Sequence, residues 1–518
     1  MSFHKGYSCI WLYLRCGCIM PRMKIKIAFV TWGGGGGIAG TARMDAYYRK
    51  YIDRDQFTPK IIFSSEPFES DKALPDYGDR IYYTGIEHRL NALVELLSDV
   101  DIVHFQGGFD PLACEAARLA EVPVLVETLH TAELGQMYPN IDLTICVSES
   151  VRAIQPFPEK AITIHNGLEI SEFPFRKGSR SSETVSILVL KPNQMEIPYL
   201  DVLKDLLDMD PRIEIRIAGN MQDEYSAISS RMKFLGKVHD MAKLYGETDL
   251  MALLSPIEAF GMVIIEAMSC GCIPIVSNVW GPPEIVTDGH DGFLASPFDA
   301  RHLRATVVRA LELHDSGQFD AIRANGRRTV EERFTIEECV KRYERAYLGQ
   351  FKKKGVRTKA FVPTAGGYKS VDADIADAFF HFRNNRTSHT MGRLEKIVGN
   401  SLENLHPCML SALFQLSIFA EAEGREPLAH TLFDSAFHRL IADSLKIGEV
   451  LKWTRSVSAA NLIKKRFSDY IMENTEKFLL IGENGNALAT LATGINAMPD
   501  SVELAEVYNL LKTKLPSP

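Results

Sequence analysis

The stretch Ser255–Ser277, "SPIEAFGMVIIEAMSCGCIPIVS", decides the fold of the region around it. Its first half predicts a short apolar helix near Gly261, and its end, residues 273–277, predicts a buried strand. A fully apolar strand next to a helix is typical of a parallel sheet that is covered on both faces. Two glutamates, Glu258 and Glu266, lie eight positions apart around the helix. The stretch thus predicts an α/β unit with one carboxylate before the helix and one along it.

Two interpretations of these glutamates are open: a solvated rim, or a site for a ligand rich in hydroxyl groups. The backbone amides near Phe260, Gly261 and Met262 are free at the helix start, where the helix dipole favours an anion. Eight helical residues advance about 12 Å, so a diphosphate at the helix start would lie between Glu258 and Glu266. Carboxylates form charge-assisted hydrogen bonds with hydroxyl groups. This layout favours a nucleotide sugar, with sugar hydroxyls on one side of the diphosphate and ribose hydroxyls on the other.

Short apolar runs alternate with amphipathic stretches from residue 24 to about 350, which is the pattern of parallel α/β sheets. The polar segment 176–183, "RKGSRSSE", interrupts the alternation, which then starts again. We therefore expect two α/β domains, at 23–178 and 179–350. The expected strands are 26–30, 60–64, 101–105, 123–129, 143–148 and 161–166 in the first domain, and 186–190, 214–219, 232–236, 250–255 and 273–277 in the second.

The two ends of the chain differ from this core. Residues 1–22 contain an apolar run that Arg15 breaks, and the run is shorter than the roughly 20 residues of a membrane-spanning helix. No small-residue cleavage site follows it cleanly. We expect a disordered or mis-assigned extension there, with a membrane-touching anchor as the alternative. A basic linker is expected at 351–370, and apolar residues at helical spacing predict an all-α domain at 371–518.

The composition is that of a soluble globular protein, with 46% hydrophobic and 24% charged residues in a chain of 518. The net charge of −8 argues against general nucleic-acid binding, which needs an excess of Lys and Arg. Nine cysteines without a paired CxxC set argue against a zinc site or a disulfide framework. A reducing cytoplasm fits these observations best.

A glycine-rich loop, Gly33–Gly37, follows the first expected strand and precedes a helix. Because glycine has no Cβ, the amides of Gly35, Gly36 and Gly37 can approach a ligand closely, and we expect them to contact the donor. The run matches GxGxxG through Gly40, but among so many glycines that match is weak. A nicotinamide or flavin site and a plain flexible turn are the alternatives. No acidic residue ends the second expected strand, which argues against the dinucleotide site.

Polar side chains follow two neighbouring strands of the first expected sheet. His130 comes just past one strand, and His104 and Gln106 stand at the equivalent end of the preceding one. Ligands bind open α/β sheets outside the carboxyl ends of the strands. His130 is therefore either a ligand-facing or a structural residue, whereas we expect His104 to be structural. In the second half, Gly281 and Glu284 lie in a proline-containing loop before a helix, where backbone amides could also face phosphate.

With these motifs the chain resembles a retaining glycosyltransferase of the GT-B fold, in family 4 of the glycosyl transferases group 1. The resemblance covers residues 24 to about 350. It implies two Rossmann-like domains that face a central cleft, the first on the acceptor side and the second binding the nucleotide sugar, followed here by the all-α domain. The motifs that carry it are "ITIHNGLE" (162–169), "FLGKV" (234–238), the stretch 249–277, "GPPEIVTDGHDGFL" (281–294) and "RFTIEECVKRYERAY" (333–347).

The resemblance also implies roles for single residues. Glu258 would face the donor sugar, Glu266 would bind the ribose and His130 would reach the donor sugar. The first glycine loop would lie near the diphosphate and the acceptor.

One stretch departs from the family pattern. The family opens its second domain with an Arg and then a Lys, which together neutralise the diphosphate. Here Lys191 is expected to replace the Arg as a point charge without a bidentate fork. The second position falls on Met195 or Glu196, neither of which is a cation. The departure predicts a weaker grip on the diphosphate, with Lys191 among the catalytic residues.

The resemblance implies transfer of a sugar from a nucleotide-sugar donor to a hydroxyl acceptor with retention, in polysaccharide, glycolipid or glycoconjugate synthesis, without a metal ion. The expected acceptor is a sugar or a lipid-linked compound, and a protein partner is expected through 371–518. We expect a cytoplasmic protein with at most peripheral contact with the inner membrane face. The alternatives are a catalytically inactive GT-B module that binds a sugar nucleotide or recruits a partner, and a nicotinamide-dependent oxidoreductase.

Overall fold

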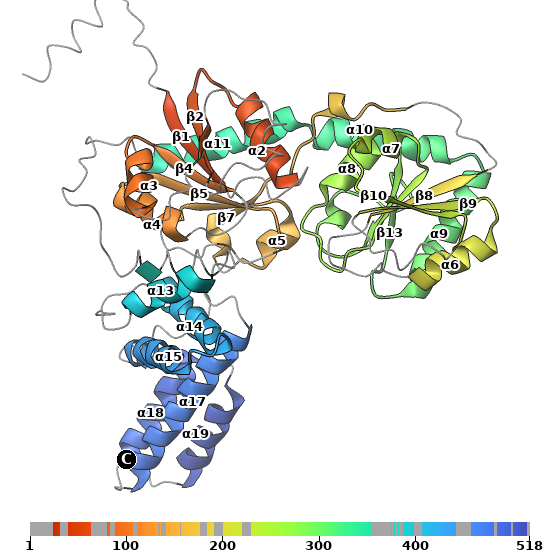
Figure 1. Cartoon of the computed structure of the whole chain (residues 1–518). Coiled ribbons are helices and arrows are strands. Elements are labelled where there is room, and N and C mark those ends of the chain that lie inside the picture. The colour runs from red at the N-terminus through yellow and green to blue at the C-terminus, as the bar shows by residue number, and fades with distance from the viewer. Residues whose placement is uncertain are drawn as a thin grey trace, which may run out of the picture.

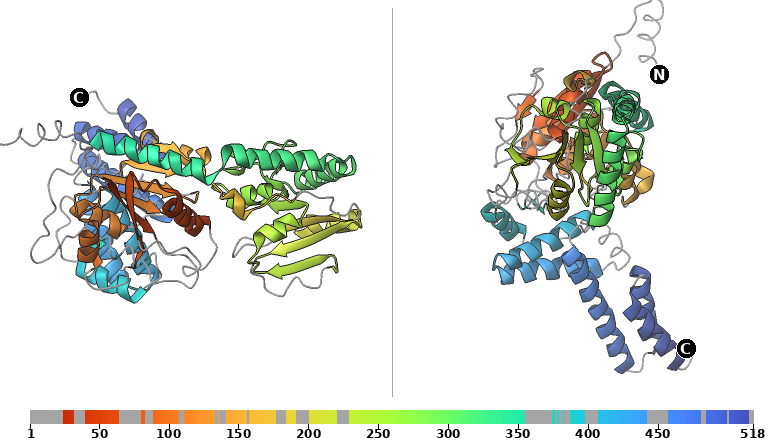
Figure 2. Two further views of the ribbon diagram at one scale, coloured as in Figure 1. Left: turned by 90° about the horizontal axis from the view of Figure 1, so that it is seen from above. Right: turned by 90° about the vertical axis from the view of Figure 1, so that its right-hand side faces the viewer.

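The computed structural model describes most of two α/β units and a set of C-terminal helices (Figure 1). The C-terminal helices lie beside the first α/β unit (Figure 2). The described residues are 24–31, 40–63, 80–82, 89–106, 111–132, 135, 141–155, 157–176, 184–190, 200–219, 229–354, 374–375, 378, 382, 387–397, 407–441, 457–480, 484–498 and 501–514.

The first unit is built on a seven-stranded sheet in the order β3-β2-β1-β4-β5-β6-β7, and every neighbouring pair is parallel. One face packs against α2 (Gly40–Tyr51), and the other against α3 (Arg89–Leu97) and α4 (Pro111–Leu119). A short helix, α5 (Glu149–Ala153), follows β6. The strands are β1 (Ile25–Thr31), β2 (Phe57–Phe63), β3 (Arg80–Tyr82), β4 (Ile102–Gln106), β5 (Val124–Leu129), β6 (Leu143–Cys146) and β7 (Ala161–Thr163).

The second unit is built on a six-stranded parallel sheet in the order β10-β9-β8-β11-β12-β13. Apolar side chains of its helices cover both faces, as a parallel sheet requires. The strands are β8 (Val185–Leu190), β9 (Ile213–Ala218), β10 (Met232–Gly236), β11 (Leu250–Leu253), β12 (Ile273–Ser277) and β13 (Phe293–Ala295). The helices are α6 (Leu200–Met209), α7 (Met241–Gly246), α8 (Met262–Ser269), α9 (Ala300–Asp315) and α10 (Phe319–Arg333).

The last helix of the α/β region, α11 (Ile336–Lys354), crosses from the second unit back to the first (Figure 2). Its Tyr343 and Tyr347 are 1% exposed and lie in the same buried cluster as β1, β4 and α2. The sequence predicted a second domain that ends at residue 350 and therefore includes this helix. The structure differs, because α11 completes the core of the first sheet.

The C-terminal region is helical in its described part, as the sequence predicted. Helices α14 (Pro407–Ala422) and α15 (Glu426–Ile441) pack side by side, as do α17 (Val457–Leu480) and α18 (Asn484–Ala497). The turn between α14 and α15 contains Gly424, whose φ of +73° favours glycine. Two further helices are α13 (Thr387–Ile397) and α19 (Val502–Lys514).

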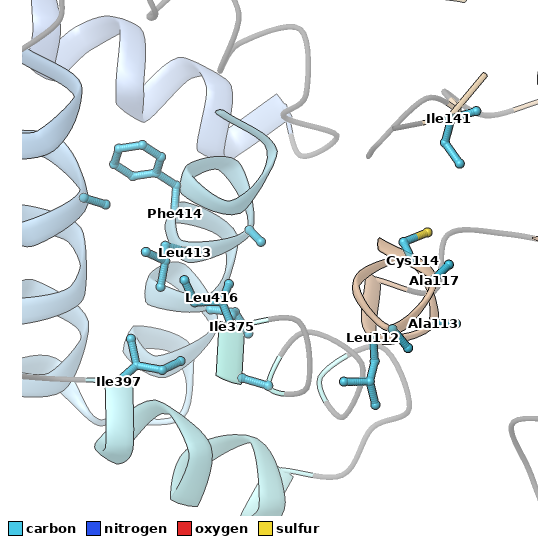
Figure 3. Packing of buried hydrophobic residues seen from close by; sticks show 14 of the residues in the cluster. Leu112, Ala113, Cys114, Ala117, Ile141, Ile375, Ile397, Leu413, Phe414 and Leu416 are labelled. Carbon is cyan, nitrogen blue, oxygen red and sulfur yellow. The ribbon is translucent and has the colours of Figure 1, made fainter. Parts of the chain in front are cut away.

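The C-terminal helices share one buried apolar cluster with the first α/β unit. Figure 3 shows side chains of α4 and Ile141 on one side of this cluster, and Ile375, Ile397 and residues of α14 on the other. Leu112 of α4 and Leu413 of α14 are both at most 1% exposed. The two parts are therefore joined by apolar packing.

Candidate functional site

The start of α8 is shaped by a glycine. Gly261 is the N-cap of α8 and has a φ of +94°, a conformation that favours glycine. A Cβ at this position would also lie 2.6 Å from Cδ1 of Ile264. The amides of the first helical turn have no acceptor within the helix itself, so Met262 begins a turn that can bind an anion.

Glu258 lies in the loop before α8. Glu258 is half-buried, and burial raises the pKa of its carboxyl group, although a hydrogen bond from the backbone N–H of Phe260 acts in the opposite direction. The Phe260 ring is 2% exposed and lies 5.7 Å from the rings of His165 and Phe334. Phe260 therefore fills the core with its side chain, and its backbone amide, expected to be free, instead donates to the Glu258 carboxylate.

Gly281 brings a second loop onto the loop of Glu258. Its backbone N–H donates to the carbonyl oxygen of Glu258 at 3.0 Å. A Cβ at position 281 would lie only 2.2 Å from the carbonyl oxygen of Ala259. The close approach of these two loops thus requires glycine, which supports the geometry around α8 rather than a direct contact of Gly281 with a ligand.

Glu266 is a buried carboxylate and not part of a solvated rim. It is 6% exposed, and its Oε1 lies 2.5 Å from Nη1 of Arg43 in α2 of the first unit. The Tyr245 hydroxyl donates to Oε2 at 3.4 Å. Burial raises the pKa of Glu266, while Arg43 and Tyr245 act in the opposite direction. The sequence analysis missed Arg43, because no local pattern links residues that lie 223 positions apart.

Glu284 makes its contacts with the first unit. Its carboxylate accepts hydrogen bonds from the backbone N–H groups of Glu149 at 2.8 Å and Ser150 at 2.9 Å, at the start of α5. Nε2 of His165 lies 2.9 Å from Oε2 of Glu284. In the same place the Ser150 hydroxyl donates to the carbonyl oxygen of Trp280 at 2.9 Å. These contacts form a clamp between the two units, and the donor-binding role expected of Glu284 from the sequence stays a prediction.

His130 lies just past the end of β5, where the sequence analysis placed it, and it is half-buried. Its Nε2 is 2.9 Å from Oε1 of Gln106. Burial lowers the pKa of His130 to about 4, so the ring is neutral at physiological pH. A neutral imidazole can orient a ligand through a hydrogen bond but supplies no positive charge.

His104 is fully buried among aromatic rings and hydrogen-bonds Thr128 and Tyr347. This is the structural position expected from the sequence. The predictions for Gly35, Gly36 and Gly37 and for Lys191 lie outside the described residues, as do Met195 and Glu196.

In the described part of the chain, no group of three or more His, Cys, Asp or Glu side chains could hold a metal ion, and the expectation of metal-free chemistry stays a prediction. Within the same residues, no helix combines the length and the apolar character needed to cross a membrane.

Residues 189–329 match the family model described as Glycosyl transferases group 1. The chain is 37% identical over 120 residues to N-acetyl-alpha-D-glucosaminyl L-malate synthase of Bacillus anthracis. The matched segment covers 23% of this chain and 31% of that protein. The chain is 26% identical over 243 residues to phosphatidyl-myo-inositol mannosyltransferase of Mycolicibacterium smegmatis, covering 41% of this chain and 63% of that protein. The chain thus spans less than two thirds of the length of either relative.

Solved structures resemble the α/β part. A glycosyltransferase from Rickettsia africae superposes with a TM-score of 0.54 at 19% identity, covering 64% of this chain and 99% of that one. Anabaena Alr3699/HepE in complex with UDP superposes with a TM-score of 0.52 at 18% identity, covering 63% of this chain and 100% of that one. The predicted GT-B fold and the resemblance to group 1 glycosyltransferases are thereby confirmed.

Proposed function

We propose that this protein is a glycosyltransferase that moves a sugar from a nucleotide-sugar donor to a hydroxyl acceptor. The observation that carries the proposal is the buried Glu266 on α8, about one turn beyond amides that can bind a diphosphate. The segment that matches the family model contains both Glu258 and Glu266. The structural neighbour bound to UDP has the same fold and supports a nucleotide-sugar donor.

In the proposed mechanism each group acts on a different part of the donor. The amides at the start of α8 bind the diphosphate and stabilise its negative charge as it leaves. Glu266 accepts hydrogen bonds from the ribose, and Glu258 and His130 hold the transferred sugar. Retention would follow from front-face attack, in which the leaving phosphate helps to deprotonate the acceptor. The chain contributes mainly positioning and electrostatic stabilisation.

The acceptor is proposed to be a sugar or a lipid-linked compound, since one relative is named a phosphatidyl-myo-inositol mannosyltransferase. We propose a cytoplasmic site of action with at most peripheral contact with the membrane. Lys191 is proposed to carry the cationic contact with the diphosphate. Without a metal ion in the mechanism, the helix-end amides and this lysine would balance the charge.

A transfer assay tests the function. The purified chain is incubated with a panel of nucleotide sugars and candidate acceptors, with and without a chelator of divalent cations, and release of nucleoside diphosphate is measured. We expect acceptor-dependent release from one class of donor that persists with the chelator. Binding of a donor without any release across the acceptor panel would instead favour an inactive GT-B module that binds a sugar nucleotide.

A groove in the C-terminal helices favours a protein partner as a second role. It has a volume of about 580 Å³ and lies between α15, α17 and α19. Phe433, Phe437 and Tyr470 are among its apolar lining residues. Its lining also carries four carboxylates against one guanidinium: Asp434, Asp469, Glu473, Glu476 and Arg466.

We propose that this groove binds a basic amphipathic helix of a partner protein. Asp469, Glu473 and Glu476 are spaced i, i+4 and i+7 on α17 and thus form one acidic stripe beside the apolar floor. A helix with an apolar face and Lys or Arg along its edge would complement both features.

Charge reversal in this groove should weaken the binding of a designed Lys/Leu amphipathic helix peptide. For Glu473→Lys/Glu476→Lys we expect about a tenfold rise in Kd, because exposed charge pairs contribute about 0.2 to 1 kcal/mol each and reversal adds repulsion. The matched control is Glu421→Lys/Glu423→Lys, which changes exposed residues outside the groove lining. Equal binding of a scrambled peptide of the same charge, or equal loss in the control, would contradict a specific docking site.

A further inference from the structure

A chain of hydrogen bonds connects the crossing helix α11 to His130. The hydroxyl of Tyr347 lies 2.6 Å from Nδ1 of His104, and Nε2 of His104 lies 2.7 Å from Oγ1 of Thr128. Nε2 of Gln106 lies 3.3 Å from the same Nδ1, and Oε1 of Gln106 lies 2.9 Å from Nε2 of His130. Apart from His130, these side chains are at most 2% exposed. Each group must therefore satisfy its hydrogen bonds within the network.

The hydroxyl group of Tyr347 fixes the direction of the first hydrogen bond in this network. A phenol is a better donor than acceptor, so its O–H donates to Nδ1 of His104 at the short distance of 2.6 Å. Burial lowers the pKa of His104 well below its usual range, so the ring is neutral and carries a single proton. With Nδ1 accepting, that proton is on Nε2 and is donated to Thr128.

The remaining proton positions follow from the first. The single lone pair of His104 Nδ1 accepts the short bond from the Tyr347 hydroxyl, and the Gln106 amide nitrogen makes a longer, weaker contact with it at 3.3 Å. An amide oxygen in that place would be repelled by the same lone pair. This orientation turns the Oε1 atom of Gln106 toward His130. An amide oxygen only accepts hydrogen bonds, so Nε2 of His130 carries the proton.

We propose that Gln106 is a positioning residue that holds His130 in the neutral Nε2–H tautomer, and that Tyr347 fixes the amide orientation of Gln106 through His104. The Nδ1 atom of His130 then remains an unprotonated acceptor. Nδ1 accepts a hydrogen bond from a hydroxyl group of the transferred sugar. This last step rests on the function proposed above, whereas the tautomer does not.

The tautomer is measured directly by NMR of the full-length chain with ¹⁵N-labelled histidines. His130 is assigned by comparison with His130→Asn, which is needed because the chain contains 14 histidines. In the unmodified protein we expect a protonated Nε2 and an unprotonated Nδ1. Signals of a protonated Nδ1 would overturn the proposal, and this outcome requires no variant to fold.

Variants test the relay. Gln106→Met and Tyr347→Phe should each give averaged signals of two exchanging tautomers at His130, whereas Gln106→Glu keeps an acceptor oxygen and should restore the protonated Nε2. Gln155→Met is the matched control, since Gln155 is another buried glutamine of the first unit but bonds Val151 and Gly135. An unchanged His130 spectrum in folded Gln106→Met would refute the relay.

Kinetics then separate the two proposals. In Gln106→Met we expect turnover of the sugar donor to fall about fivefold to tenfold, the loss of one hydrogen bond of about 1 kcal/mol or slightly more. Affinity for the free nucleoside diphosphate should not change, because it lacks the sugar. A shifted tautomer with unchanged turnover would refute the contact with the sugar. Absence of nucleotide binding in the unmodified chain would refute the proposed function but leave the tautomer result standing.

Discussion

Replacing Glu266 by Gln is expected to weaken the binding of free nucleoside diphosphate and of nucleotide sugar to the same extent. Both ligands contain the ribose, and the loss of a hydrogen bond to a charged group costs about 1.5 to 3 kcal/mol, which is roughly a tenfold to hundredfold rise in Kd. The variant also removes the negative charge that faces Arg43. Isothermal titration with both ligands measures the effect.

The substitution Glu258→Gln is expected to have a different effect from Glu266→Gln. Because Glu258 is assigned to the transferred sugar, affinity for the free diphosphate should stay almost unchanged while turnover of the sugar donor falls by about tenfold or more. Glu312→Gln on α9 is the matched control, since Glu312 is exposed and far along the chain from either glutamate. Equal diphosphate affinity in Glu266→Gln and the parent would contradict the binding of the ribose by Glu266. Normal turnover in Glu258→Gln would contradict the binding of the transferred sugar by Glu258.

Glu284→Ala is expected to separate the two α/β units. The substitution removes the acceptor for the backbone amides of Glu149 and Ser150 and the partner of His165. Hydrogen bonds to charged groups contribute about 1.5 to 3 kcal/mol each, so the free energy of unfolding should fall by about 2 to 4 kcal/mol after relaxation of the exposed groups. Thermal unfolding gives the loss of stability, and limited proteolysis near residue 176 reports the opening of the units.

The clamp also predicts a dependence on pH. Burial raises the pKa of Glu284, but the hydrogen bonds from His165 and from the α5 amides outweigh it and hold the pKa below its usual value. A carboxyl group whose pKa is lowered on folding stabilises the protein above its unfolded pKa and loses this effect as the pH falls through the folded pKa. The difference in stability between parent and Glu284→Ala should therefore shrink at acid pH. If Glu284→Ala unfolds at the same temperature as the parent but binds the donor more weakly, Glu284 binds the donor and does not act as a clamp.

Contiguous apolar runs predicted the central strands well. Strand β12 begins and ends where the sequence indicated, because a buried parallel strand is apolar on both faces. The bounds of the edge strand β10 also match, although that strand is partly exposed. Strands β3 and β13 were missed, since each has only three residues and too few positions to show a pattern.

Contacts between distant parts of the chain could not be predicted. The motif 333–347 placed this segment at the end of the second domain but did not show that α11 packs against the first sheet. In the same way, Glu266 was predicted from its local motif, whereas its partner Arg43 and the clamp partners of Glu284 come from other elements. Local patterns report which residues are buried or charged, and tertiary packing decides which of them meet.

The measurement that tests the account most directly is thermal unfolding of the full chain with a panel of nucleoside diphosphates, their sugars and reduced nicotinamide nucleotides. A ligand at 100 times its Kd stabilises the folded state by about 2.7 kcal/mol, so one nucleoside diphosphate and its sugars should raise the melting temperature, and Glu266→Gln should abolish the rise. A rise with the nicotinamide nucleotide alone, or none with any nucleoside diphosphate at millimolar concentration, would contradict the proposed nucleotide-sugar site.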